Sequence, residues 1–153
     1  MSARCVFLDR DGVINEKAPA GEYIRSYDDF RLLPNIVDWI RLFNTLGFLV
    51  IVVTNQRGIA RGLMTEEDLS CIHKAMLNDL AAGGARIDDI FYCPHGFDSC
   101  ECRKPKPGMV YAARDKWNID LAHSLLIGDS DSDQRLAAGC GMPFLRVRDG
   151  RIA

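Results

Sequence analysis

Two aspartates that stand two positions apart, Asp9 and Asp11, are the first residues of this chain whose types and spacing suit chemistry. They directly follow a short apolar run at residues 5–8, which is typical of a buried strand. Side chains at positions i and i+2 of an extended chain point to the same side, so both carboxylates can face one crevice. One ionised aspartate can attack phosphorus if a cation offsets its repulsion from the phosphate, while the other moves protons. The same residues also fit a turn with two solvated acids.

A hydroxyl group and two cations that suit phosphate binding lie farther along the chain. Thr54 ends a second apolar run at residues 48–53, and its hydroxyl could donate to a phosphoryl oxygen together with the backbone N–H groups that follow it. Lys104 could act as a point charge between the attacking carboxylate and the phosphate. The adjacent Arg103 could grip an oxyanion with its planar fork. The alternatives are a polar turn and a solvated basic pair.

Further acids follow another apolar run, at residues 124–127. Asp129 is expected at a strand-to-helix turn, where its oxygen atoms can bind a hard cation, since Mg²⁺ takes one or two such carboxylates plus waters. Asp133 could be a second ligand or could orient Lys104. Capping of the following helix is the competing interpretation for Asp133, and Asp131 could serve that purpose equally well.

A cluster of soft ligands makes up the segment at residues 93–102. Cys93, His95, Cys100 and Cys102 are enough to close a tetrahedral zinc site, although their spacing is unlike that of a zinc finger. A closed site has no open coordination position, so we expect a structural zinc that stiffens the loop before Arg103. The alternative is a group of unliganded thiols.

The elements that end beside these residues must position them. The hydrophobic pattern predicts strands at 5–8, 48–53, 89–92, 124–127 and 144–147, with an irregular stretch at 15–34. Helical patterns lie between them, with Asn35 and Thr65 as the expected caps of the first two helices and Gly83 and Gly84 ending the second. This alternation predicts an α/β fold, a single doubly wound parallel sheet with helices on both faces. In such sheets ligands bind beyond the carboxyl ends of the strands, where the reactive residues fall.

Taken in order, these motifs resemble the four motifs of the haloacid dehalogenase (HAD) superfamily, which match Asp9-x-Asp11, Thr54, Lys104 and the segment 129–133. The closer resemblance is to a subgroup that carries a zinc loop and no cap domain. It implies a single HAD-like domain over residues 1–153 with a zinc-binding loop at 93–102.

Within this subgroup, the segments 54–62 and 102–105 resemble the phosphatases that remove the 7-phosphate of D-glycero-D-manno-heptose 1,7-bisphosphate. The alternative is a histidinol-phosphate phosphatase, because the cysteine loop is short, as in those enzymes. Arg57 also stands where the heptose enzymes usually carry a small serine.

The resemblance implies a role for each matched residue. Asp9 becomes an aspartyl phosphate, and Asp11 protonates the leaving oxygen and then deprotonates water. Catalytic Mg²⁺ is held by the carboxylates of Asp9 and Asp129 and by the backbone carbonyl of Asp11. Thr54 and Lys104 bind the transferring group. The expected substrate contacts are Arg10, Asn55, Gln56, Arg57 and Arg103.

Composition limits the other classes of function. The chain has 153 residues, 48% of them hydrophobic, which favours a folded protein over a disordered one. A net charge of -2 provides no broad basic surface for nucleic acid or for an anionic membrane. The first apolar run is too short for a signal peptide or a membrane span. Together with the resemblance, which implies a small phosphorylated metabolite as the partner, we expect a cytoplasmic, monomeric enzyme.

Two other classes remain as alternatives. A phospho-receiver signalling domain also uses an acid pocket, a threonine and a lysine, but its acceptor aspartate is expected after a middle strand, where this chain has Thr54. The other is a zinc-bearing interaction module with a dead active site. Every expected catalytic position is filled in this chain, which argues against that alternative.

Overall fold

Six strands form one sheet in the computed structural model, which describes residues 2–152. The strands are β1 (Cys5–Leu8), β2 (Leu49–Asn55), β3 (Asp89–Cys93), β4 (Leu125–Gly128), β5 (Phe144–Arg148) and β6 (Arg151–Ile152). Their order is β3-β2-β1-β4-β5-β6, and the first five strands are parallel, as predicted.

The strand predicted at residues 144–147 was expected to be the last one, and this is wrong, because a sixth strand follows it. β6 turns back and pairs antiparallel with β5. The turn consists of Asp149 and Gly150, whose φ values of 51° and 73° are both left-handed. An Asp-Gly pair in this conformation is a favoured two-residue hairpin loop, so the signal was present in the sequence.

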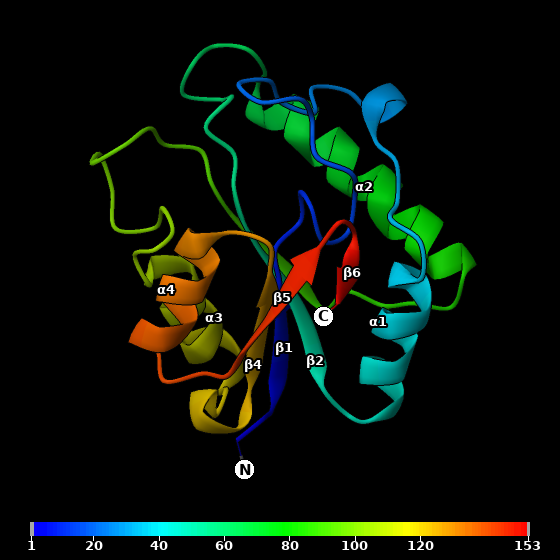
Figure 1. Ribbon diagram of the computed structural model, residues 1–153, viewed down its shortest axis with the longest axis vertical. Helices are drawn as coiled ribbons and strands as arrows, with labels where there is room; N and C mark the ends of the chain where they lie inside the picture. Colours follow the sequence, from blue (N-terminus) through cyan, green and yellow to red (C-terminus); the bar gives the residue numbers. More distant parts are fainter. Residues whose placement is uncertain (1, 153) are drawn as a thin grey trace.

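Helices cover both faces of the sheet (Figure 1). They are α1 (Ile36–Thr45), α2 (Glu66–Ala82), α3 (Gly108–Trp117) and α4 (Asp131–Gly139), with short 3₁₀ turns η1 (Tyr27–Asp29) and η2 (Leu121–His123). Val6 and Leu8 of β1 pack in one apolar cluster with α1 and α2, whereas Cys5 and Phe7 pack in the other with α3 and α4. This alternation along a buried strand follows from its two-residue period. Within the described residues, no helix is both long and apolar enough to cross a bilayer.

The helix starts partly match their predicted caps. Thr65 and Asp68 form a reciprocal capping box at the start of α2. Asn35 occupies the N-cap position of α1, but it is left-handed at φ 69° and its side chain makes no cap hydrogen bond to the described chain. The cap of α4 is Ser130, which accepts from the backbone N–H of Asp133, so neither Asp131 nor Asp133 caps it. Asp133 is therefore available for another role.

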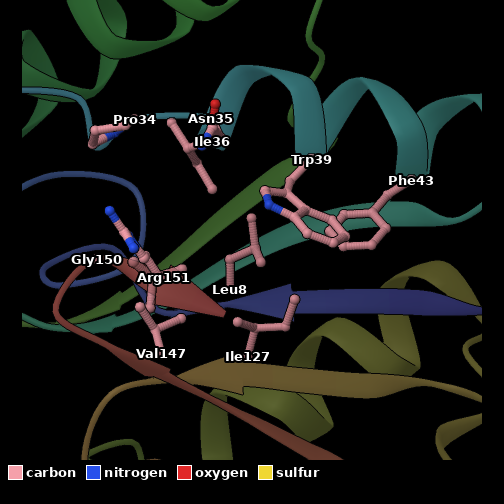
Figure 2. A pocket seen from close by; sticks show the side chains of 11 residues that line it. Leu8, Pro34, Asn35, Ile36, Trp39, Phe43, Ile127, Val147, Gly150 and Arg151 are labelled. Atoms are coloured by element: carbon pink, nitrogen blue, oxygen red, sulfur yellow. The ribbon is translucent and has the colours of Figure 1, made fainter. Parts of the chain in front are cut away.

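A cavity of about 230 Å³ lies between α1 and the sheet (Figure 2). Leu8 and Ile127 form its floor, and Trp39 and Phe43 reach over it from α1. The floor residues are the last apolar positions of β1 and β4 before Asp9 and Asp129. The cavity thus lies directly behind the strand ends that carry the reactive carboxylates.

Candidate active site

The predicted reactive residues converge at one edge of the sheet. β1 lies between β2 and β4, with Leu8 in register with both Val52 and Ile127. Since all three strands are parallel, the residues that follow these positions emerge at the same edge. Asp9, Thr54 and Asp129 are brought there by the register alone, whereas Lys104 arrives on the loop after β3.

Lys104 is the centre of the buried polar network. Its Nζ donates to Asp9 Oδ1 at 2.9 Å, to Asp133 Oδ1 at 2.7 Å and to the carbonyl of Val53 at 3.1 Å. Burial alone would lower the pKa of Lys104, but the two carboxylates outweigh it and raise that pKa, so the ammonium stays charged. Of the two roles considered for Asp133, the structure shows the one in which it orients Lys104.

The carboxylate of Asp9 is crowded by other acids. Burial raises its pKa well above the usual value, the charge of Lys104 opposes this, and the charges of Asp133 and Asp11 add to the rise. Single oxygen atoms of Asp9, Asp129 and Asp133 lie within 4.8 Å of one another. The Oδ1 atom of Asp129 is buried and has no hydrogen-bond partner among the described residues. Such a cluster can hold one divalent cation through hard oxygen ligands.

Two close neighbours shape the surroundings of Asp129. Its Oδ2 forms an ion pair with Lys17 Nζ at 2.8 Å, which the sequence analysis did not foresee. Gly12 is left-handed at φ 88°, and a Cβ there would lie 2.2 Å from the same Oδ2. Glycine is therefore required at position 12 for both its backbone conformation and its lack of a side chain.

Asp11 is held by donors on both oxygens. Oδ1 accepts from Arg10 Nη2 at 2.8 Å and Nε at 3.2 Å and from Asn15 Nδ2 at 2.9 Å, while Oδ2 accepts from Gln56 Nε2 at 3.0 Å. Burial would raise the pKa of Asp11, but the charge of Arg10 and the hydrogen bonds from Asn15, Arg10 and Gln56 outweigh it and lower that pKa. Asp11 is thus an oriented carboxylate at the mouth of the site.

The prediction that Arg10 contacts a substrate is wrong in this structure. Arg10 has 0% exposure, and its guanidinium turns inward to Asp11 and to His73 on α2. A fully buried side chain cannot touch a ligand that arrives from solvent, so Arg10 acts through Asp11. Asn15, which shares this task, lies in an irregular loop and carried no pattern that could have revealed it.

The two residues after Thr54 connect other parts of the site through side-chain hydrogen bonds. Gln56 donates its Nε2 hydrogens to Asp11 and to Thr54 Oγ1, both at 3.0 Å, so its amide group bridges these two residues. Asn55 accepts from the backbone N–H of Lys104 at 3.0 Å. This contact fastens the loop of Lys104 to the end of β2.

The four predicted soft ligands are also brought together. Cys93 Sγ lies 2.8 Å from Cys102 Sγ and 3.5 Å from Cys100 Sγ, and His95 Nδ1 lies 3.2 Å from Cys102 Sγ. The ligand atoms all lie within 4.8 Å of one another, and the cysteines are free thiols. This donor set and spacing fit one tetrahedral metal ion.

Two arginines meet at an exposed ring on this loop. The guanidinium carbons of Arg57 and Arg103 each lie 4.4 Å from the ring centroid of Phe97. Arg103 Nη1 is buried without an acceptor in the described part of the chain. One cavity of about 490 Å³ is lined by Arg103, Asn55 and Lys104. A second cavity, of about 270 Å³, runs from Asp11 along the loop at residues 17–24.

Known proteins share this sequence and fold. Residues 101–153 match the family model described as HAD-hydrolase-like. The chain is 41% identical over 148 residues to the D-glycero-beta-D-manno-heptose-1,7-bisphosphate 7-phosphatase of Rhodopseudomonas palustris, covering 92% of this chain and 81% of that protein. It is 40% identical over 135 residues to the corresponding alpha-anomer enzyme of Campylobacter jejuni, covering 88% and 76%. The structure of D,D-heptose 1,7-bisphosphate phosphatase from B. bronchiseptica with magnesium and phosphate superposes with a TM-score of 0.87 at 38% identity, covering 94% and 79%. As the motifs predicted, the chain therefore belongs to the HAD-like phosphatases, in the family that includes the heptose-1,7-bisphosphate 7-phosphatases.

Proposed function

We propose that this phosphatase hydrolyses the 7-phosphate of D-glycero-D-manno-heptose 1,7-bisphosphate through an aspartyl-phosphate intermediate. The observation that carries the proposal is the buried arrangement of Asp9, Lys104 and Asp133, in which a fixed ammonium lies against the carboxylate that must attack. The names of the most similar relatives supply the substrate class. Residues 1–153 act as one domain, with the loop at 93–102 as part of its site.

In the first half-reaction, an Asp9 oxygen attacks phosphorus as the bond to the leaving oxygen breaks, and Asp11 gives that oxygen its proton. The lowered pKa of Asp11 favours its carboxylate form, so the arriving phosphate must raise that pKa through its negative charge. In the second half-reaction, Asp11 takes a proton from water, which attacks the phosphoryl group and frees Asp9. Lys104 and Thr54 bind the transferring oxygens throughout.

Magnesium fits the acid cluster. The carboxylates of Asp9 and Asp129 and the backbone carbonyl of Asp11 would hold it, and the partnerless Oδ1 of Asp129 is the observation that supports this assignment. When bound, the ion supplies positive charge that offsets repulsion between the attacking carboxylate and the phosphate. The same charge would lower the pKa of Asp9 and keep this nucleophile ionised.

Zinc fits the cluster of Cys93, His95, Cys100 and Cys102. Three thiols and one imidazole fill a tetrahedral shell, so the ion would have a structural role. Arg103 follows the last ligand directly, and its backbone N–H donates to Cys100 Sγ at 3.3 Å. The bound ion would thus fix the direction of Arg103 and Lys104. Free thiols also suit a reducing, cytoplasmic compartment.

Arg57 and Arg103 favour a bisphosphate over histidinol phosphate. Their guanidinium groups share the ring of Phe97 beside the cavity that Lys104 lines, and they would meet the phosphate that is not cleaved. Arginine suits this task because its fork binds phosphate with two parallel hydrogen bonds.

A substrate panel tests the proposal. We expect kcat/KM to be highest for one anomer of the heptose bisphosphate, lower for the heptose monophosphates and lowest for histidinol phosphate. A higher kcat/KM for histidinol phosphate would overturn the substrate assignment. A stable phosphoprotein without turnover on any of these esters would favour the phospho-receiver alternative.

A further inference from the structure

A buried histidine on α2 has no part in the mechanism described so far. His73 is 7% exposed, and its Nε2 lies 3.1 Å from Nη1 of Arg10. An arginine can only donate, so Nε2 must accept and the ring proton must lie on Nδ1. Burial and, next, the charge of Arg10 lower the pKa of His73 to about 3, which keeps the ring neutral near physiological pH.

Arg10 needs this acceptor because its charge is completely buried. The Nε and Nη2 edge of its guanidinium is used by Asp11 Oδ1, and Nη1 remains for His73. The Phe30 ring lies 5.8 Å away, where it can stabilise the cation through its face. The two hydrogen-bonded partners hold the planar group from different sides, so His73 determines how the fork meets Asp11.

We propose that His73 is a positioning residue for Asp11 and that it acts through Arg10. The inference rests on the proposed role of Asp11 as the group that moves protons. α2 is an independent support for this chain of contacts, since its capping box and the buried side chains of Leu69 and Met76 anchor it to the core. The Tyr92 ring of β3 also lies near His73, with its centroid 6.5 Å from that of the imidazole. The proton-transfer carboxylate is thus aligned by a helix that does not itself touch the site.

The test uses the dependence of rate on the leaving group. An alkyl phosphate such as the heptose bisphosphate needs a proton on its leaving oxygen, whereas a nitrophenyl phosphate does not. We expect His73→Leu to lower kcat about 10- to 100-fold on the alkyl ester, as for other misplaced catalytic groups, with a much smaller change on the nitrophenyl ester. His73→Gln should recover most of this loss, because its Oε1 lies near the position of Nε2 and can accept from Arg10.

Two controls separate positioning from stability. Met76→Ala removes a buried side chain from the same helix, so it should lower stability. Any change in kcat should be equal for the two esters. If His73→Leu does not fold, His73→Asn replaces it, because that amide is too short to reach Arg10.

Equal losses on both esters for His73→Leu, or no recovery with His73→Gln, would overturn the inference. Asp11→Asn distinguishes this failure from failure of the proposed function. If Asp11→Asn discriminates between the esters and His73→Leu does not, the positioning role alone is wrong. If Asp11→Asn itself does not discriminate, the proton-transfer role of Asp11 is wrong and the inference falls with it.

Discussion

Lys17 Nζ lies 2.8 Å from Oδ2 of Asp129, the carboxylate that we propose as a magnesium ligand. The Lys17 side chain is 56% exposed and that of Asp129 is 13% exposed, so an exposed cation covers a nearly buried anion. The hydrogen bond to Asp129 is the main reason that the pKa of Lys17 is raised. Its positive charge therefore opposes the binding of a metal ion to the same carboxylate, whose Oδ1 atom has no hydrogen-bond partner among the described residues.

Lys17→Met should tighten magnesium binding about 2- to 5-fold, the range that follows from the strength of an exposed ion pair. Titration calorimetry without substrate measures this directly. Lys116→Met is the matched control, since Lys116 is 59% exposed and pairs with Asp89 at 2.7 Å. Unchanged or weaker binding in Lys17→Met would show that Lys17 does not oppose metal binding.

Asp9→Asn should abolish turnover and raise thermal stability. The amide cannot attack phosphorus, which removes the covalent step. The folded-state pKa of Asp9 is raised, so its ionisation near neutral pH opposes folding, and a neutral isostere relieves this cost. Melting curves recorded with EDTA, together with kcat, check both parts. Retention of a tenth of wild-type kcat, or a lower melting temperature, would contradict the respective part.

Asp133→Asn should have the opposite effect on stability. Burial alone would raise the pKa of Asp133, but the charge and hydrogen bond of Lys104 outweigh it and lower that pKa. Its contribution is therefore present above the unfolded pKa, about 4 for aspartate, and is lost as the pH falls through the lower folded pKa. Urea unfolding across acidic pH should show the variant less stable near neutrality and the difference shrinking on acidification. A difference that does not depend on pH would rule out this ion pair as its source.

Cys102→Ser should release zinc, lower the melting temperature and reduce activity that added magnesium does not restore. Zinc binding to a closed thiolate site is partly folding free energy, whereas magnesium in an open oxygen site exchanges readily. Elemental analysis of purified wild-type and variant proteins measures the zinc. Cys71→Ser is the control, because Cys71 is exposed on α2 and lies outside the cluster. Wild-type protein without zinc would show that the cluster is a group of thiols.

Arg57→Ser should raise KM for the heptose bisphosphate about 10-fold, the effect of losing one hydrogen bond to a charged group. The heptose 7-phosphate, which lacks the second phosphate, should be nearly unaffected. The comparison of KM between the two esters isolates the contact. Equal changes on both would mean that Arg57 does not meet the second phosphate.

Local patterns along the chain were sufficient for most of the framework. The apolar run of β1, the capping box of Thr65 and the paired glycines after α2 act over a few residues, so they can be read without knowledge of the fold. The convergence of Asp9, Thr54 and Asp129 followed because parallel strands place their carboxyl ends at one edge. The hairpin at Asp149 and Gly150 was equally local, although its signal was not used.

Tertiary packing decided the partners of the long polar side chains. Arg10 turned inward because a buried guanidinium must find acceptors, and the acceptor on α2 lies 63 positions away in the chain. Ser130 caps α4 by accepting from the backbone N–H of Asp133. The carboxylate of Asp133 is therefore left to accept from Lys104. Lys17 reaches Asp129 across a loop with no regular pattern. Which charge lies beside which depends on how distant elements pack, and no local pattern in the sequence carries that information.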